Sequence, residues 1–90
     1  MKQEDINLLK QLGLTTYEAK AYITLSSLIQ ATADEISEKS DIPRSKIYDV
    51  LKRLNSKDYI KIESGRPLTY HVNPPINVLK REKEKFIRRI

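Results

Sequence analysis

The chain has 90 residues, enough for one small domain, and it contains no cysteine, which excludes a disulfide framework and a thiolate metal site. Hydrophobic residues make up 39% of the chain and charged residues 32%, and the hydrophobic residues are regularly spaced, which favours a globular helical domain over disorder. No apolar run is long enough for a membrane span or a signal peptide. We therefore expect a soluble cytoplasmic protein with no membrane partner.

The net charge of +5 is unevenly distributed along the chain. Residues 1–42 carry four basic and seven acidic side chains (−3), residues 43–66 carry seven and three (+4), and residues 67–90 carry six and two (+4). A basic segment that follows an acidic one favours a polyanionic partner, because binding releases counterions. The alternative is a solvated basic surface, and charge alone does not decide between them.

Two helices are predicted in the first third of the chain. Residues 5–12 place Ile6 and Leu9 on an inner face, with Leu8 and Leu12 as further candidates, and Gly13 ends this helix. The sequence Thr-Thr-Tyr-Glu at residues 15–18 has the pattern of a capping box, which begins a second helix over residues 16–29. Its apolar positions follow the helical period: Ala21, Tyr22, Leu25, Leu28 and Ile29.

A helix-turn-helix unit follows. A second capping box at residues 32–35 predicts a short helix with Ala33, Ile36 and Ser37 toward the core. Residues 40–42 interrupt the helical pattern, and Pro43 suits the first position of the next helix, which extends to Leu54. Its apolar residues recur at i, i+3, i+4 and i+7, namely Ile47, Val50, Leu51 and Leu54. This stripe leaves a polar face that points away from the core.

A β-hairpin is predicted after the helix-turn-helix unit. Residues 59–63 and 68–72 alternate between apolar and polar side chains, and residues 64–67 have turn chemistry with Arg66 at the tip. A helix-turn-helix followed by such a hairpin is the layout of a winged helix. The predicted fold is therefore mainly α with a small β-hairpin, and residues 1–75 form this domain.

Residues 76–90 are predicted to form a separate C-terminal helix. Apolar residues and one lysine recur there at intervals of 3, 4, 3 and 4, with Ile87 adjacent, at positions Ile76, Leu79, Lys83, Phe86 and Ile90. This spacing is typical of a coiled-coil seam, so we interpret the helix as a dimerisation element. The alternative is an amphipathic helix that folds back on its own domain.

The polar face of the second helix-turn-helix helix holds the leading candidates for DNA contact. Arg44, Ser45 and Lys46 occupy its first turn, the end that such helices direct at base edges. Arginine can contact guanine O6 and N7 together, whereas lysine and serine more often hold phosphates. The alternative is that these residues only solubilise a surface turn.

Five further residues are candidate contacts. Tyr48 either touches a thymine methyl or a phosphate, or packs on the neighbouring helix. Asp49 either accepts from cytosine N4 or orients Arg53, four residues further on. Lys52 and Arg53 are predicted phosphate contacts, and Arg66 is predicted to reach the minor groove or the backbone from the wing.

Enzymatic chemistry and cofactors are not expected. His71 is the only histidine and has no cysteine or carboxylate cluster around it, so no metal site is predicted. Glu35, Glu38 and Asp41 lack an acid–base partner, and two glycines do not make a phosphate-cradling loop. No small-molecule site is identifiable in the sequence.

Four blocks of the sequence resemble the DNA-binding domain of the TrmB-like family of archaeal transcription regulators. They are LGLTTYEAKAY at residues 12–22, ATADEI at 31–36, IPRSKIYDVL at 42–51, and Gly65-Arg66-Pro67 followed by Tyr70 and by Asn-Pro-Pro at 73–75. The resemblance implies a winged-helix dimer that binds operator DNA, with Arg44 to Leu54 in the major groove and Arg66 on the wing. Better-known members of the family continue into a large sugar-binding domain, so sugar sensing is not expected from these 90 residues.

Together these observations predict a sequence-specific transcriptional regulator that is associated with the nucleoid. It would bind double-stranded DNA as a homodimer on a pseudo-palindromic site. Two alternatives are a winged-helix protein-interaction module of a larger assembly and a non-specific architectural DNA binder.

Overall fold

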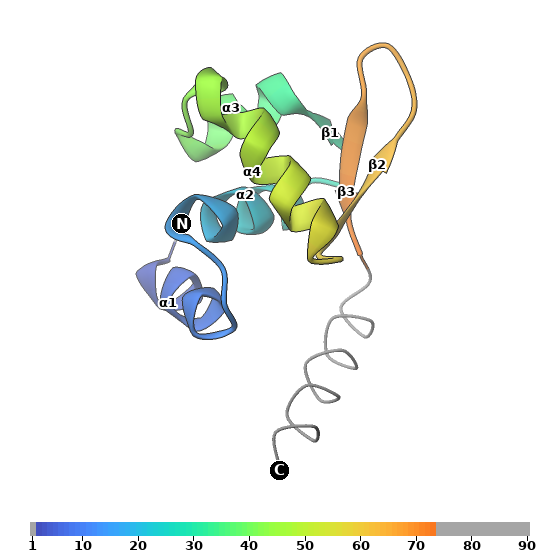
Figure 1. The fold of residues 1–90 in the computed structure, drawn as a ribbon. Helices are drawn as coiled ribbons and strands as arrows, with labels where there is room; N and C mark the ends of the chain where they lie inside the picture. The colour runs from blue at the N-terminus through green and yellow to red at the C-terminus, as the bar shows by residue number, and fades with distance from the viewer. Residues whose placement is uncertain (1, 74–90) are drawn as a thin grey trace.

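The computed structural model describes residues 2–73. The order of elements in this range is α1 (Gln3–Gln11), α2 (Thr16–Ser26), β1 (Ala31–Thr32), α3 (Ala33–Ser40), α4 (Arg44–Ser56), β2 (Ile60–Glu63) and β3 (Thr69–Val72) (Figure 1). The predicted C-terminal helix and its dimerisation residues, Ile76, Leu79, Lys83, Phe86, Ile87 and Ile90, lie outside the described residues.

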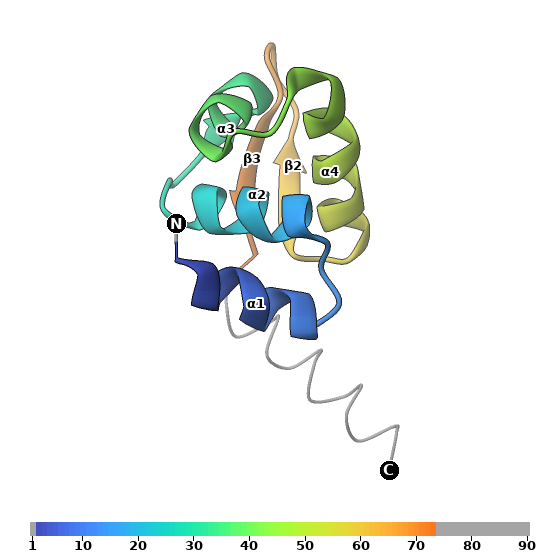
Figure 2. The same ribbon diagram turned by 90° about the vertical axis from the view of Figure 1, so that its left-hand side faces the viewer.

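Helix α2 is the centre of the domain. It packs against α1, α3, α4 and β3, and Figure 2 shows it in the middle, with α1 at one end of the molecule and the tip of the hairpin at the other. The large side chains with the lowest exposure come from α2, α3, α4, β2 and the loops next to them, and include Leu25, Ile36, Ile42, Ile47, Leu51, Leu54, Tyr59 and Ile60. One hydrophobic core therefore fixes all the helices relative to the sheet.

The sheet has three antiparallel strands in the order β1-β3-β2. The predicted hairpin is confirmed, with Ile60 opposite Val72 and Ile62 opposite Tyr70. Strand β1 was not predicted from the sequence, because two residues are too few to show alternation. It pairs Ala31 with Tyr70, so the short strand joins the wing to the start of α3.

Local capping patterns were predicted correctly. In both boxes the threonine hydroxyl accepts from the backbone N–H of the glutamate, and the glutamate accepts from the backbone N–H of the threonine, for Thr15 with Glu18 and Thr32 with Glu35. Gly13 has a φ of +105°, as expected of a residue that follows a helix end. Pro43 is the N-cap of α4 rather than its first helical residue, since its ψ of 142° is extended.

The prediction for the outer ends of α1 and α2 was wrong in part. Leu8 and Leu12 are 58% and 40% exposed, because α1 lies at the end of the domain and buries only Ile6 fully. Helix α2 ends at Ser26, and Ile29 is 95% exposed. The hydroxyls of Ser26 and Ser27 each donate to the carbonyl three residues before, at 2.7 Å, and such local bonds compete with continuation of the helix.

Within residues 2–73 the structure is that of a mainly helical winged-helix domain, with four helices and a small antiparallel sheet. No helix in this range combines the length and apolarity required to cross a membrane.

Candidate nucleic-acid interface

Helix α4 has one buried face and one exposed face, as the sequence predicted. Ile47, Leu51 and Leu54 are fully buried and Val50 is 6% exposed. All seven predicted contact residues of this helix are exposed: Arg44, Ser45, Lys46, Tyr48, Asp49, Lys52 and Arg53. The hydrophobic stripe thus determines which polar side chains face outward.

The turn between α3 and α4 is held by buried contacts. Asp41 adopts the left-handed conformation, with a φ of +58°, and the next residue, Ile42, is 2% exposed. The Ser37 hydroxyl donates to the Ile42 carbonyl at 2.5 Å, and the Ile42 N–H donates back to the Ser37 carbonyl at 3.3 Å. These bonds fix the direction in which α4 leaves the turn.

Arg44 forms an ion pair that no local sequence pattern predicted. Its Nη2 lies 3.5 Å from Oδ2 of Asp34, and the two side chains are 75% and 57% exposed. Asp34 belongs to the first turn of α3, whereas Arg44 begins α4. The two residues are ten positions apart in different helices, so no helical periodicity relates them.

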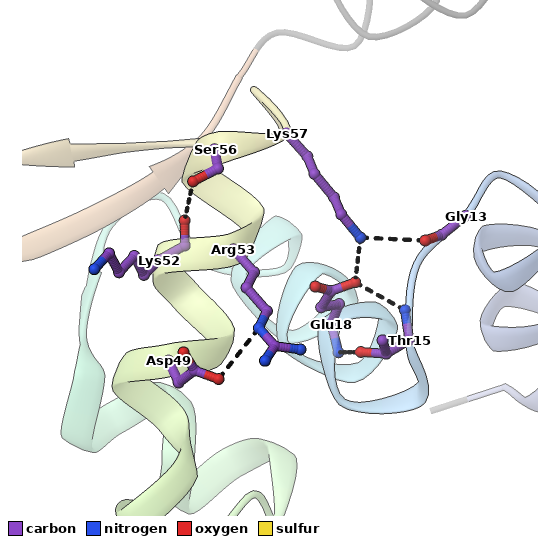
Figure 3. A network of polar contacts seen from close by, with 8 residues as sticks. All are labelled: Gly13, Thr15, Glu18, Asp49, Lys52, Arg53, Ser56 and Lys57. Carbon is purple, nitrogen blue, oxygen red and sulfur yellow. Dashed lines mark hydrogen bonds and ion pairs between the residues drawn. The ribbon is translucent and has the colours of Figure 1, made fainter.

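Asp49 and Arg53 form the predicted pair along α4. Arg53 Nε lies 3.2 Å from Asp49 Oδ2, at the spacing of one helical turn. The pair places Asp49 where it can orient Arg53, the second of the two roles considered for it. Figure 3 shows the pair on the side of α4 that lies beside the start of α2.

A buried carboxylate ties the end of α4 to the start of α2. The Lys57 ammonium lies 2.7 Å from Glu18 Oε1 and donates to the Gly13 carbonyl at 3.2 Å (Figure 3). Glu18 is only 1% exposed and also accepts from the Thr15 N–H at 2.8 Å. The capping-box pattern predicted the role of Glu18 as a cap, but no local pattern pointed to Lys57, which is 39 residues away.

The electrostatics of Glu18 follow from these contacts. Burial alone would raise the pKa of its carboxyl, but the Lys57 hydrogen bond, the Thr15 N–H and the charge of Lys57 together hold the pKa below its ordinary value. The carboxylate therefore stays charged at neutral pH and keeps both helices attached to it.

Tyr48 lies on α4, beside a hollow that α3 and the wing also line. It is 60% exposed and lines a hollow of about 290 Å³ together with residues of α3 and the wing, including Asp34, Leu68 and Tyr70. Burial and the neighbouring Tyr48 raise the pKa of Tyr70. Tyr48 thus stands at the edge of this hollow, with most of its surface open to solvent.

The wing is attached where its strands meet the turn, and the turn itself is exposed. The Gln30 amide donates to the Thr69 hydroxyl at 2.5 Å and to Glu63 at 3.3 Å, so the end of each strand next to the turn is tied to the loop before β1. Arg66 is exposed in the turn between β2 and β3. His71 is half-buried on β3, 3.6 Å from Glu63.

Groups that could bind a metal are absent from the described part of the chain. Residues 2–73 contain no set of three or more histidine, aspartate or glutamate side chains close enough to hold an ion. The surface described above instead has two arginines in ion pairs, two lysines without an ion pair within residues 2–73, and hydroxyl groups, all on one helix face.

Comparison with known sequences relates the chain to one family. A family model described as "Sugar-specific transcriptional regulator TrmB" matches residues 9–76. The HTH-type sugar sensing transcriptional regulator TrmBL1 of Pyrococcus furiosus is 40% identical over 88 residues, which are 97% of this chain and 26% of that protein. The DNA-binding HTH-type transcriptional repressor TrmBL2 of Thermococcus kodakarensis is 33% identical over 88 residues, 97% of this chain and 32% of that protein.

Comparison with solved structures agrees. The structure of TrmBL2, described as an archaeal chromatin protein that shows a novel mode of DNA binding, matches with a TM-score of 0.88 and 30% identity, over 99% of this chain and 36% of that chain. A MarR family regulator from Silicibacter pomeroyi matches with a TM-score of 0.71 and 18% identity, over 90% of this chain and 58% of that chain. The second likeness shows a shared fold alone. The chain spans 26% and 32% of the lengths of the two curated relatives named above.

Proposed function

The chain belongs to the TrmB family of transcriptional regulators, and we propose that it is a sequence-specific DNA-binding regulator that acts as a homodimer. In this proposal α4 enters the major groove, and the wing contacts the backbone or the minor groove. The family is one of regulators and not of enzymes, as the sequence predicted. A regulator of this kind works at the nucleoid in the cytoplasm.

The single observation that supports this proposal most strongly is the exposed face of α4. Between Arg44 and Ser56 the helix has four basic side chains and one acidic side chain, and all of them are exposed while the apolar residues are buried. A rigid helix with a basic outer face and its first turn unobstructed suits the major groove, which admits one α-helix. The proposed contacts are Arg44, Ser45, Lys46, Tyr48, Asp49, Lys52, Arg53 and Arg66.

The homodimer is supported by two apolar surfaces. The first is the predicted coiled-coil seam of residues 76–90. The second is formed by two exposed leucines, Leu8 of α1 and Leu12 directly after it. Helix α1 lies at the opposite end of the domain from the tip of the wing (Figure 2), so a partner there would leave the face of α4 free for DNA.

Architectural DNA binding is a second candidate function. It is favoured by the likeness to TrmBL2, which is described as an archaeal chromatin protein and matches with a TM-score of 0.88. The two functions differ in how affinity depends on sequence. A specific regulator binds its site about 10³-fold or more tightly than other DNA, whereas an architectural protein binds most sequences alike.

Selection of bound fragments from a random DNA library tests the proposal. We expect enrichment of a pseudo-palindromic motif. The association constant of the protein for that motif should then fall steeply as the salt concentration rises. Uniform binding without enrichment would support the architectural function instead. Absence of binding even at low salt would leave a protein-interaction module as the better explanation.

A further inference from the structure

Asp34 is an exposed acidic residue beside the mostly basic face of α4. It lies in the first turn of α3, is 57% exposed, and contacts Arg44 Nη2 at 3.5 Å. It also lines the hollow between α3, Tyr48 and the wing. A carboxylate at this place would lie close to DNA that is bound to α4, so its effect on binding has to be explained.

The fold holds Asp34 and Arg44 opposite each other. The Thr32 and Glu35 capping bonds, at 3.0 and 3.2 Å, fix the start of α3 next to Asp34. The two bonds between Ser37 and Ile42 fix the turn that leads to Arg44. Because both backbones are held in place, the carboxylate can direct the long arginine side chain.

The arginines and lysines of α4 differ in their partners. Arg44 pairs with Asp34, and Arg53 pairs with Asp49. Within residues 2–73 no ion pair involves Lys46 or Lys52. A group that reads a base edge benefits from a fixed orientation, whereas a lysine acts on phosphates as a mobile point charge.

A single contact with Asp34 does not use up the donors of Arg44. A guanidinium has five N–H groups in a rigid fork, so one contact at Nη2 leaves enough of them for guanine O6 and N7. We propose that Asp34 is a specificity-determining residue that positions Arg44 to read a guanine. This inference deepens the proposed function and rests on it.

The charge of Asp34 has a second effect, separate from the positioning of Arg44. A carboxylate near the DNA surface repels phosphates whatever the base sequence is, so it lowers the affinity for all DNA alike. This repulsion leaves the ratio between specific and non-specific affinity unchanged. Only the orientation of Arg44 widens that ratio, so the two effects can be measured separately.

The test compares affinities of the full 90-residue chain for two DNA duplexes. One contains the motif selected by the wild-type protein, and the other has the guanine opposite Arg44 replaced. The variants are Asp34→Ala, Arg44→Ala and the double variant, with Glu38→Ala as a matched control. Glu38 is an exposed acid of the same helix, one turn further on, so it reports the loss of charge without the contact.

We expect Asp34→Ala to lower the ratio of the affinity for the selected motif to the affinity for the altered duplex by about tenfold, which is the order of one lost bidentate contact. The affinity for the altered duplex itself should rise, because the carboxylate no longer repels phosphates. Glu38→Ala should change the ratio less than about twofold, and in the Arg44→Ala background the effect of Asp34→Ala on the ratio should disappear. The inference would be overturned if Asp34→Ala left the ratio of the two affinities unchanged, or if it lowered that ratio equally in the Arg44→Ala background. Either result would leave the proposed function standing. A wild-type protein with no sequence preference would overturn the proposed function, and the inference with it.

Discussion

At the level of single residues, Arg44 and Lys52 are expected to contribute to binding in different ways. Arg44 is paired with Asp34 and begins α4, whereas Lys52 lies two turns further along the helix and forms no ion pair within residues 2–73. Replacing Arg44 with alanine should weaken binding to the preferred site by about tenfold or more and change non-specific binding little. Replacing Lys52 with alanine should weaken binding to all sequences and lower the slope of log affinity against log salt by about 1.

Measurement of affinity for specific and non-specific duplexes at several salt concentrations separates these effects. Lys39→Ala is a suitable control, because Lys39 is an exposed lysine of α3 and not among the predicted contacts. Equal effects of Arg44→Ala on both duplexes would contradict base reading by this residue.

A residue-scale prediction also concerns Asp41, at the end of α3. Its φ of +58° lies in the left-handed region, which costs about 1 kcal/mol for a residue with a Cβ. Asp41→Gly should therefore be at least as stable as the wild type, and Asp41→Ala about 1 kcal/mol less stable than the glycine variant. Urea unfolding gives both free energies.

Lys39→Gly and Lys39→Ala are the control for the two substitutions of Asp41. Lys39 lies inside α3 and is exposed, so alanine should be the more stable choice there by about 1 kcal/mol. If alanine were better than glycine at both positions, the conformation of Asp41 would not be left-handed in solution.

At the level of secondary-structure elements, the contact between α2 and the end of α4 should depend on pH. The pKa of Glu18 is lower in the folded protein than its ordinary value of 4.5, so the unfolded chain binds the proton more tightly. Glu18 therefore stabilises the fold above about pH 4.5, and this contribution disappears as the pH falls through the lowered pKa. The free energy of unfolding should decrease over that interval.

Lys57→Met tests this prediction. Removal of the ammonium leaves a buried carboxylate with only its Thr15 contacts, which should cost about 1–2 kcal/mol at pH 7, less than in a fully buried pair because Lys57 is 39% exposed. The variant should also lose less stability on acidification than the wild type does. Lys61→Met, at an exposed lysine of β2, is the control and should behave like the wild type in unfolding experiments at both pH values.

At the level of the whole molecule, sequence and structure agree wherever local patterns determine the result. The spacing of Ile47, Val50, Leu51 and Leu54 predicted the buried face of α4, and both capping boxes were predicted from four residues each. The contacts that orient α4 were not predictable in this way. The pairs Arg44–Asp34 and Lys57–Glu18 join residues of different helices, so only the packing of the core brings them together.

The geometry of the duplex limits how the two domains of a homodimer can be arranged on DNA. A homodimer with α4 in the major groove must place its two copies on one face of the duplex, so the half-sites should be about one helical turn apart, roughly 10 base pairs, or a multiple of that. Insertion of about 5 base pairs between the half-sites would turn one of them to the opposite face of the duplex and should abolish binding by the dimer. Insertion of about 10 base pairs would return it to the same face and should restore part of the affinity. Measurement of affinity and stoichiometry on the three duplexes checks this, and binding that ignores the insertion would indicate that each domain binds DNA independently.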